Sequence, residues 1–279
     1  MKNINDILIH ENDIKPFHVF ENAVIFNLDC LEVLSHINEN SVDMIFADPP
    51  YMLSNDGFTC QNGRMVNVNK GKWDESKGFE EDINFHDTWI AACKRVLKPE
   101  GTIWISGTYH SIYQCGYLLQ KIGFHILNDI TWFKPNASPN LSCRFFTASH
   151  ETLIWARKDK NAKHTFNYDE MKNGIFPEDK IKKENTQMRS VWSIPKLKKE
   201  EKEFGAHPTQ KPLDLLLRII KASTKEGDVI LDPFNGSGTT GIAALLTDGR
   251  FYIGAEVDDG YCDLTVKRFL NFREKKDEN

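Results

Sequence analysis

The residues best suited to chemistry in this chain are Asp48, Pro49, Pro50 and Tyr51, which directly follow the apolar run 42–47. Two consecutive prolines end a strand because proline has no N–H group to donate to a neighbouring strand. We therefore expect these residues at the carboxyl end of a strand, where open α/β sheets bind ligands. A carboxylate, a backbone carbonyl held by a rigid proline and an aromatic ring suit the binding of a flat amine. Taken alone, the same residues also fit a plain turn.

A second candidate site lies in residues 229–241, which read VILDPFNGSGTTG. An apolar strand, a glycine-rich turn and a helix start follow one another there, and Gly236, Gly238 and Gly241 have the spacing G-x-G-x-x-G. Glycine permits a tight bend and a close approach of the backbone to a ligand. Glu256 follows 20 residues after Gly236, where a carboxylate can accept hydrogen bonds from ribose hydroxyls. The pattern predicts a nucleoside-cofactor site, although a structural turn or a dinucleotide oxidoreductase also fits the glycines.

Short apolar runs alternate along the chain with longer amphipathic runs. This alternation predicts an α/β fold with a doubly wound, mostly parallel sheet. The expected strands are 23–28, 42–47, 102–106, 125–132, 152–156, 229–231 and 251–255. The expected helices are 30–37, 85–97, 111–122, 213–223, 239–246 and 260–272.

Two segments interrupt this alternation. Residues 52–78 are rich in glycine and lack periodicity, so we expect a long, mobile loop beside Tyr51. Residues 158–206 are polar and lysine-rich with isolated aromatic side chains. We interpret them as an insertion within a single catalytic domain that spans residues 1–279.

The distribution of charge is uneven, although the net charge of the chain is −5. Residues 134–205 contain 15 Lys and Arg against 10 Asp and Glu, so positive charge is concentrated in this segment. A basic segment is typical of a surface that contacts phosphates, and a solvated lysine-rich surface gives the same count.

The composition excludes several other classes of protein. No stretch approaches the roughly 20 apolar residues of a membrane span, and the polar start of the chain lacks a signal peptide's apolar region. We therefore expect a cytoplasmic protein with no membrane partner. The six cysteines are scattered, with no Cys-x-x-Cys pair and no histidine cluster, so neither a disulfide framework nor a metal site is predicted.

The two motifs together resemble a known family. Asp-Pro-Pro-Tyr at 48–51 and Asp-Pro-Phe-x-Gly-Ser-Gly-Thr-Thr at 232–240 resemble the amino-methyltransferases that use S-adenosylmethionine to modify exocyclic amines of DNA bases. The catalytic motif precedes the cofactor motif, with a variable basic segment between them, which is similar to the β group. The resemblance covers almost the whole chain. It implies a Rossmann-like methyltransferase fold with permuted motif order and a terminal antiparallel hairpin.

The resemblance also implies a set of site residues. The catalytic residues would be Asp48, Pro49, Pro50 and Tyr51. The residues that bind S-adenosylmethionine would be Asp29, Cys30, Asp48, Lys211, Asp232, Phe234, Gly236, Ser237, Gly238, Thr239 and Glu256. The residues beside the target base and DNA would be Phe133, Lys134, Arg144 and Phe145. Core packing is nevertheless expected for at least one of the two phenylalanines.

The implied reaction is methylation of adenine N6 in DNA, because relatives that act on cytosine N4 more often carry Ser in place of Asp48. Asp48 and the Pro49 carbonyl would each accept one N–H of the amine, and Tyr51 would stack on the base. A base inside a duplex must first rotate out of the helix. Residues 158–206 would be the inserted target-recognition region.

Residues 139–144 and 207–212 look most like the DpnA-like second methylases of GATC restriction-modification systems. This resemblance implies methylation of GATC and a cognate restriction endonuclease that acts in the same system without a physical complex. Relatives in this group often form homodimers, so a homodimer is a further expectation.

Other functions remain open from the sequence. A methyltransferase for cytosine N4, for RNA adenine or for a protein glutamine amide uses similar chemistry, but the RNA and protein enzymes usually place the cofactor motif first. A DNA-binding module that keeps the cofactor without catalysis would not need intact residues 48–51. A nicotinamide-dependent oxidoreductase fits the glycine turn and leaves Asp-Pro-Pro-Tyr unexplained.

Overall fold

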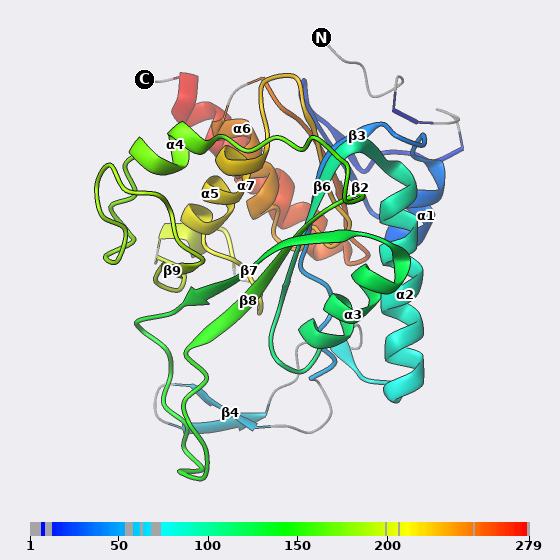
Figure 1. The fold of residues 1–279 in the computed structure, drawn as a ribbon. Helices are drawn as coiled ribbons and strands as arrows, with labels where there is room; N and C mark the ends of the chain where they lie inside the picture. The colour runs from blue at the N-terminus through cyan, green and yellow to red at the C-terminus, as the bar shows by residue number, and fades with distance from the viewer. Residues whose placement is uncertain are drawn as a thin grey trace.

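The protein is described by a computed structural model that covers residues 7–8, 13–53, 58–61, 64–67, 74–198, 200–205, 207–247 and 249–277. Within these residues, one sheet of nine strands crosses the molecule with helices on both faces (Figure 1). In spatial order the strands are β1 (His18–Val19), β2 (Ala23–Phe26), β11 (Phe251–Ala255), β10 (Val229–Asp232), β3 (Val42–Ala47), β6 (Leu97–Gly107), β8 (His150–Arg157), β7 (His125–Phe133) and β9 (Val191–Ser193).

The centre of the sheet is parallel. β2, β11, β10, β3 and β6 pair in parallel with their neighbours. β8 is antiparallel to both β6 and β7, and β1 is antiparallel to β2. The doubly wound, mostly parallel fold is therefore confirmed. The antiparallel hairpin is β7–β8, but β9 lies outside it and pairs in parallel with β7.

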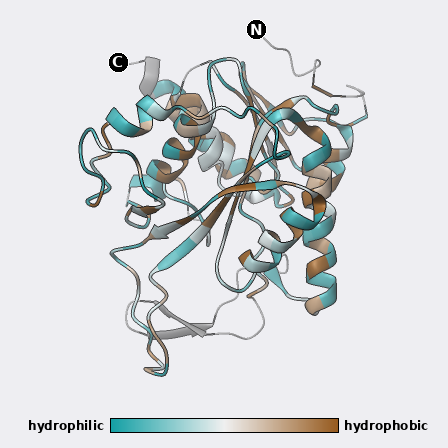
Figure 2. Ribbon diagram, in the orientation of Figure 1, coloured by the Kyte–Doolittle hydropathy of each residue, from teal (hydrophilic) through white to brown (hydrophobic). Residues whose placement is uncertain are grey.

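Helices form one layer on each face of this sheet. One layer consists of α1 (Cys30–His36), α2 (Phe79–Val96) and α3 (Ile112–Ile122), and the other of α5 (Leu213–Ser223), α6 (Thr239–Leu246) and α7 (Asp259–Asp277). Successive side chains of a strand point to opposite faces. Along β3, Ile45 packs in the core under α1–α3, whereas Met44 and Phe46 pack in the core under α5–α7. Apolar residues accordingly follow the strands and the inner sides of the helices (Figure 2).

Most expected elements are confirmed, and several have different limits. The bounds of β3, β11, α5 and α6 are those predicted. Helix α2 begins at Phe79 instead of 85, because its first turn is stabilised by acidic residues and by Asp82, which accepts hydrogen bonds from Ser76 Oγ (2.6 Å) and the Lys77 N–H (3.2 Å). That first turn is largely exposed, so apolar periodicity did not reveal it.

The segment 52–78 is not a loop throughout. It contains a two-stranded antiparallel hairpin, β4 (Phe58–Gln61) and β5 (Arg64–Asn67). Residues 54–57, 62–63 and 68–73 of this segment lie outside the described residues, and its mobility stays a prediction.

The basic segment after β8 is fastened to the same sheet and to α5. It contains the short helix α4 (Tyr168–Asn173), a 3₁₀ turn at Glu200–Lys202 and strand β9. The Arg218 guanidinium of α5 lies 2.5 Å from carboxylate oxygens of both Glu178 and Asp179. The Arg218 and Asp179 side chains are only 0% and 1% exposed, so this ion pair is buried. A buried cation between two carboxylates thus ties the segment to the core.

Replacing Arg218 with methionine is expected to lower the free energy of unfolding by about 3–5 kcal/mol, because it leaves two carboxylates buried without their cation. Urea denaturation measures this change. The control is Lys221→Met, which removes an exposed ion pair with Glu170 on the same helix and should cost less than about 1 kcal/mol. Equal losses in the two variants would contradict the proposed role of the buried pair.

In the described part of the chain, no helix combines the length and the apolar character that crossing a membrane requires.

Candidate active site

The two sequence motifs meet at one edge of the sheet. β3 and β10 are parallel neighbours, with Met44 opposite Ile230 and Ile45 opposite Leu231. The chain therefore leaves both strands on the same side, which brings Asp48 and Asp232 to a common cavity of about 560 Å³. β11 and β2 continue the sheet beside β10 and supply residues 255–257 and 28–30 to the same cavity.

Most of the predicted cofactor residues line this cavity. They are Asp29, Cys30, Asp48, Lys211, Asp232, Phe234, Gly236, Ser237, Thr239 and Glu256. Gly238 is not among the lining residues. It caps α6 with a left-handed backbone (φ +74°), and a Cβ atom there would lie 2.5 Å from Thr265 Cγ2. This glycine is therefore needed for the turn and for packing against α7.

One wall of the cavity was not predicted. The start of α2 and the residues before it contribute Glu75, Lys77, Glu81, Asp82, Asn84 and Phe85. Among the described lining residues, seven carboxylates face two lysines: the acids are Asp29, Asp48, Glu75, Glu81, Asp82, Asp232 and Glu256. An acidic cavity favours a ligand that carries positive charge.

Two of these carboxylates have strongly altered acidity. Asp232 accepts hydrogen bonds from the Phe234 N–H (3.0 Å) and Thr240 Oγ (2.6 Å), and burial raises its pKa to about 7. Glu256 accepts from the Gly236 N–H at 2.7 Å, and burial likewise raises its pKa to about 7. Cys30 lines the cavity as a neutral thiol, because burial raises its pKa to about 12.

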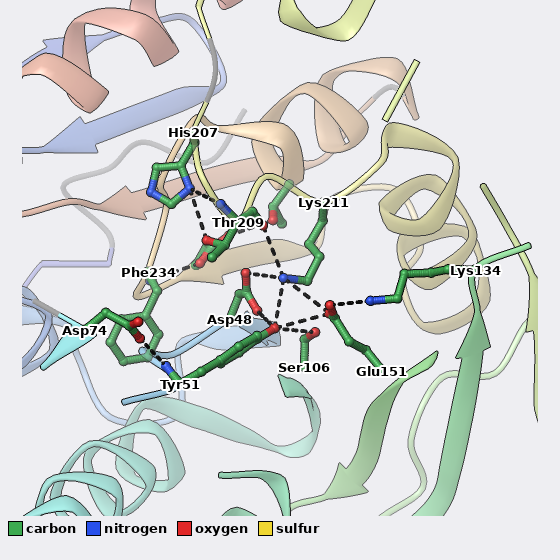
Figure 3. A network of polar contacts seen from close by, with 12 residues as sticks. Asp48, Tyr51, Asp74, Ser106, Lys134, Glu151, His207, Thr209, Lys211 and Phe234 are labelled. Atoms are coloured by element: carbon green, nitrogen blue, oxygen red, sulfur yellow. Dashed lines mark hydrogen bonds and ion pairs between the residues drawn. The ribbon is translucent and has the colours of Figure 1, made fainter. Parts of the chain in front are cut away.

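The catalytic motif forms a buried hydrogen-bonded corner (Figure 3). Asp48 Oδ1 accepts the Tyr51 hydroxyl at 2.6 Å, and Asp48 Oδ2 lies 2.5 Å from Lys211 Nζ. Lys211 Nζ also donates to Tyr51 Oη (2.9 Å) and to the Thr209 carbonyl (3.2 Å). Burial lowers the pKa of Lys211, but Asp48 and Glu151 raise it further, so the net shift is upward. Burial raises the pKa of Tyr51, which keeps its hydroxyl a donor.

Glu151 extends this corner toward β7, and its role was not predicted. Its Oε1 accepts from Lys134 Nζ at 2.7 Å, and its Oε2 lies 3.3 Å from Tyr51 Oη and 3.7 Å from Lys211 Nζ. Ser106 of β6 lies 3.4 Å from Tyr51 Oη. Both residues are on strands whose position beside β3 depends on strand order, which no local pattern in the sequence specifies.

Asp74 holds the backbone that follows the two prolines. Its carboxylate is fully buried and accepts three successive N–H groups, from Tyr51 (2.7 Å), Met52 (2.9 Å) and Leu53 (3.3 Å). Met52 has a left-handed backbone (φ +57°), and such consecutive N–H groups form a nest for an anion. Asp74 therefore fixes Tyr51 and both ends of the 54–73 segment at one point.

The residues predicted beside the target base are separated into two environments. Phe133 is 38% exposed and Phe145 is 66% exposed, so the expectation that at least one of them packs in the core was wrong. They stay outside because Phe133 ends β7 and Phe145 belongs to the exposed β7–β8 connection. Arg144 is also exposed, whereas Lys134 is buried with its ammonium on Glu151. The neighbouring Phe146, which was not predicted, is almost fully exposed.

Replacing Asp232 with asparagine is expected to make stability less dependent on pH. The pKa of the folded carboxyl is about 7, above the ordinary value of an aspartate, so ionisation destabilises the fold as pH rises toward 7. Relative to wild type, the variant should therefore gain about 3 kcal/mol of unfolding free energy between pH 5 and pH 8.

Urea unfolding at the two pH values measures this gain. A matched Asp263→Asn change on the exposed side of α7 should show no pH-dependent difference from wild type. A pH-independent effect of Asp232→Asn would show that the buried carboxyl is not the titrating group.

Comparison with known proteins identifies relatives over almost the whole chain. The sequence profile of the DNA methylase family matches residues 42–267. The chain is 49% identical over 261 residues to the Type II methyltransferase M2.MboI of Moraxella bovis, covering 93% of this chain and 89% of that protein. It is 50% identical over 255 residues to the Type II methyltransferase M2.DpnII of Streptococcus pneumoniae, covering 91% and 92% of the two chains.

Solved structures give the same result for the fold. The M1.HpyAVI–SAM complex is 27% identical, with a TM-score of 0.62 over 88% of this chain and 98% of that chain. A DNA modification methylase from Thermus thermophilus, complexed with S-adenosyl-L-methionine, is 25% identical, with a TM-score of 0.60 over 88% and 91%. The PvuII cytosine-N4-specific DNA methyltransferase is 20% identical and shares the fold, with a TM-score of 0.72 over 92% and 89%.

The cavity fits S-adenosylmethionine. This molecule carries a sulfonium and an ammonium group, which the excess of carboxylates in the lining complements. In the described structure, the buried Ser237 Oγ and Gln210 Oε1 line the cavity and have no hydrogen-bond partner. Buried polar atoms of this kind are normally satisfied by a bound group or water. Together with the profile match and the close relatives, this fit shows that the chain belongs to the DNA methylase family and is a DNA methyltransferase that uses S-adenosylmethionine.

Proposed function

We propose that this enzyme methylates the N6 amine of adenine within a specific DNA sequence, GATC. The observation that carries the proposal is the environment of Asp48. Its carboxylate lines the cofactor cavity, and its Oδ2 already holds a nitrogen donor, Lys211 Nζ, at 2.5 Å. An exocyclic amine offers the same kind of N–H donor to this oxygen.

The corner would act on the amine through hydrogen-bond acceptors. The lone pair of an exocyclic amine is delocalised into the base, so the nitrogen is a weak nucleophile. Asp48 and the Pro49 carbonyl would each accept one N–H, which favours the pyramidal nitrogen and stabilises the positive charge that develops on it. Pro50, which lines the cavity, keeps this backbone rigid. When bound, S-adenosylmethionine supplies an electrophilic methyl group.

Tyr51 would have a larger role than stacking on the base. Its side chain is only 4% exposed, and its hydroxyl is hydrogen-bonded to Asp48. It would therefore orient the carboxylate that receives the amine, while one face of its ring borders the base.

The cofactor would be held from opposite walls of the cavity. Glu256 would accept ribose hydroxyls, and Asp29 and Cys30 would lie against the adenosyl group. Asp232 and Lys211 would border the methionine end. Phe234 and the turn from Gly236 to Thr239 would form the floor.

DNA would be contacted by exposed groups around this cavity. Phe133, Arg144 and Phe145 lie at or beside the β7–β8 connection, which projects beyond the sheet in Figure 1. An exposed aromatic ring can stack on an unpaired base, and an arginine can pair with a phosphate or a guanine edge. Residues 158–206 would form the target-recognition region, and the 52–78 segment would move beside the opened site.

The biological setting follows from the relatives, which are named Type II methyltransferases. The GATC site is supported by the resemblance of residues 139–144 and 207–212 to the second methylases of GATC systems. The enzyme would protect DNA in the cytoplasm from a restriction endonuclease of the same specificity, without forming a complex with it. It would act as a homodimer.

A methylation assay with three duplexes tests the substrate. The enzyme and a labelled methyl donor are mixed with duplexes that contain GATC, the same bases in shuffled order, or GATC with N6-methyladenine on both strands. Label should enter the first duplex alone, and nucleoside chromatography should identify it as N6-methyladenine. Equal incorporation into the shuffled duplex would reject GATC, and N4-methylcytosine as product would reject adenine.

Replacing Asp48 with alanine is expected to reduce methyl transfer by at least about 100-fold, because the acceptor for the amine is lost. Calorimetry should show that cofactor affinity is largely retained, since many other residues line the cavity. Full turnover by this variant would reject the acceptor role.

Replacing Asp74 with alanine is expected to lower kcat by about 10- to 100-fold, because small displacements of reacting groups have effects of this size. Asp74→Asn is the matched control. Its amide oxygen can still accept the Tyr51 and Met52 N–H groups, which both bind Asp74 Oδ1, so it should lose much less activity. Equal losses in the two variants, or a loss of cofactor affinity in either, would contradict a role in positioning Tyr51.

A further inference from the structure

Four charged side chains meet behind the catalytic corner, from four separate parts of the chain. They form an alternating row of Lys134, Glu151, Lys211 and Asp48 (Figure 3). Their side chains are 11%, 14%, 6% and 13% exposed, so all four are largely removed from water. The formal charge of the row is zero, which is the condition under which buried charges are tolerated.

The row conflicts with amine binding as it stands. Asp48 Oδ1 is engaged by the Tyr51 hydroxyl and Asp48 Oδ2 by Lys211 Nζ. A target amine that binds Asp48 must displace one of these donors. Lys211 occupies the position of a nitrogen donor, so its ammonium is the group that the amine would replace.

Displacing a buried ammonium from its only carboxylate would be strongly unfavourable. Lys211 has a second carboxylate within reach, because Glu151 Oε2 lies 3.7 Å from Nζ. A movement of about 1 Å would convert this contact into a full charge-assisted hydrogen bond. Lys134 holds the other oxygen of Glu151 at 2.7 Å, which keeps Oε2 turned toward Lys211 and Tyr51.

We infer that Glu151 is a positioning residue that takes over the Lys211 ammonium when the target amine binds Asp48. The exchange replaces one N–H donor on Asp48 by another and moves the ammonium from one carboxylate to the next. No net charge enters or leaves the buried row. The inference rests on the proposed methylation of an amine at Asp48, and it gives Glu151 and Lys134 a function that the cofactor cavity does not require, because neither residue lines it.

A double-mutant cycle tests this exchange in the full-length enzyme. The variants are Glu151→Gln, Lys211→Met and the two combined, and the measurement is the single-turnover rate of DNA methylation at saturating cofactor. Glu151→Gln keeps the size of the side chain and removes its charge. It should lower the rate by about 10- to 100-fold, within the range of coupling between contacting residues. Calorimetry should show that its cofactor dissociation constant changes less than about twofold, and KM for DNA should stay unchanged.

The decisive comparison is made in the Lys211→Met background. There is no ammonium to accommodate in this background, so adding Glu151→Gln should change the rate by less than about twofold. Equal effects of Glu151→Gln with and without Lys211 would overturn the inference, because they would show that Glu151 acts on DNA or on the fold directly. A loss of cofactor binding in Glu151→Gln would overturn it as well.

Two controls separate these outcomes from general damage. Asp43→Asn breaks a comparable half-buried ion pair with Lys98, 2.6 Å long and away from the corner, and should leave the rate unchanged. If Glu151→Gln does not fold, Lys134→Met takes its place in the cycle with the same expected non-additivity. A wild-type enzyme that methylates no DNA would refute the proposed function, whereas an active wild type with an additive cycle refutes only the role of Glu151.

Discussion

The site depends above all on the parallel pairing of β3 with β10. Because Ile45 lies opposite Leu231, both strands end at the same edge and deliver their acidic residues to one cavity. An antiparallel arrangement would place Asp48 and Asp232 at opposite edges of the sheet. The two buried cores, one under each helical layer, maintain this register, since a shift by one residue would turn every apolar side chain of β3 to the wrong face.

A second constraint is the cost of burying charge. The edge of the sheet collects more carboxylates than the fold needs for its own stability, and each is satisfied differently. Asp232 and Glu256 accept backbone or hydroxyl donors and keep raised pKa values. Asp48 is paired with a cation, and Asp74 is surrounded by backbone N–H groups. These different partners separate residues that can respond to a ligand from one that only holds the backbone.

Local patterns predicted the parts of this arrangement that are contiguous in sequence. Strand β3 with its two prolines, and β10 with its glycine turn, could be located because apolar runs and breakers lie next to each other. Glu151 and Ser106 could not, because their position depends on β8 lying between β6 and β7. The burial of Lys134 was missed for the same reason, since a lysine in a basic segment gives no sign of a partner 17 residues away. Gly238 matched the cofactor pattern but serves packing, which spacing alone does not distinguish.

The buried carboxylate of Asp74 has a consequence for how such enzymes diversify. Leu53 and Asp74 bring the entry and the exit of residues 54–73 to a single anchor directly behind Tyr51. Twenty residues thus leave and rejoin the fold at the same point, in the manner of a cassette. Insertions, deletions or exchanges within the cassette leave its two attachment points unchanged. Selection can therefore remodel a surface close to the substrate while the reactive groups keep their geometry.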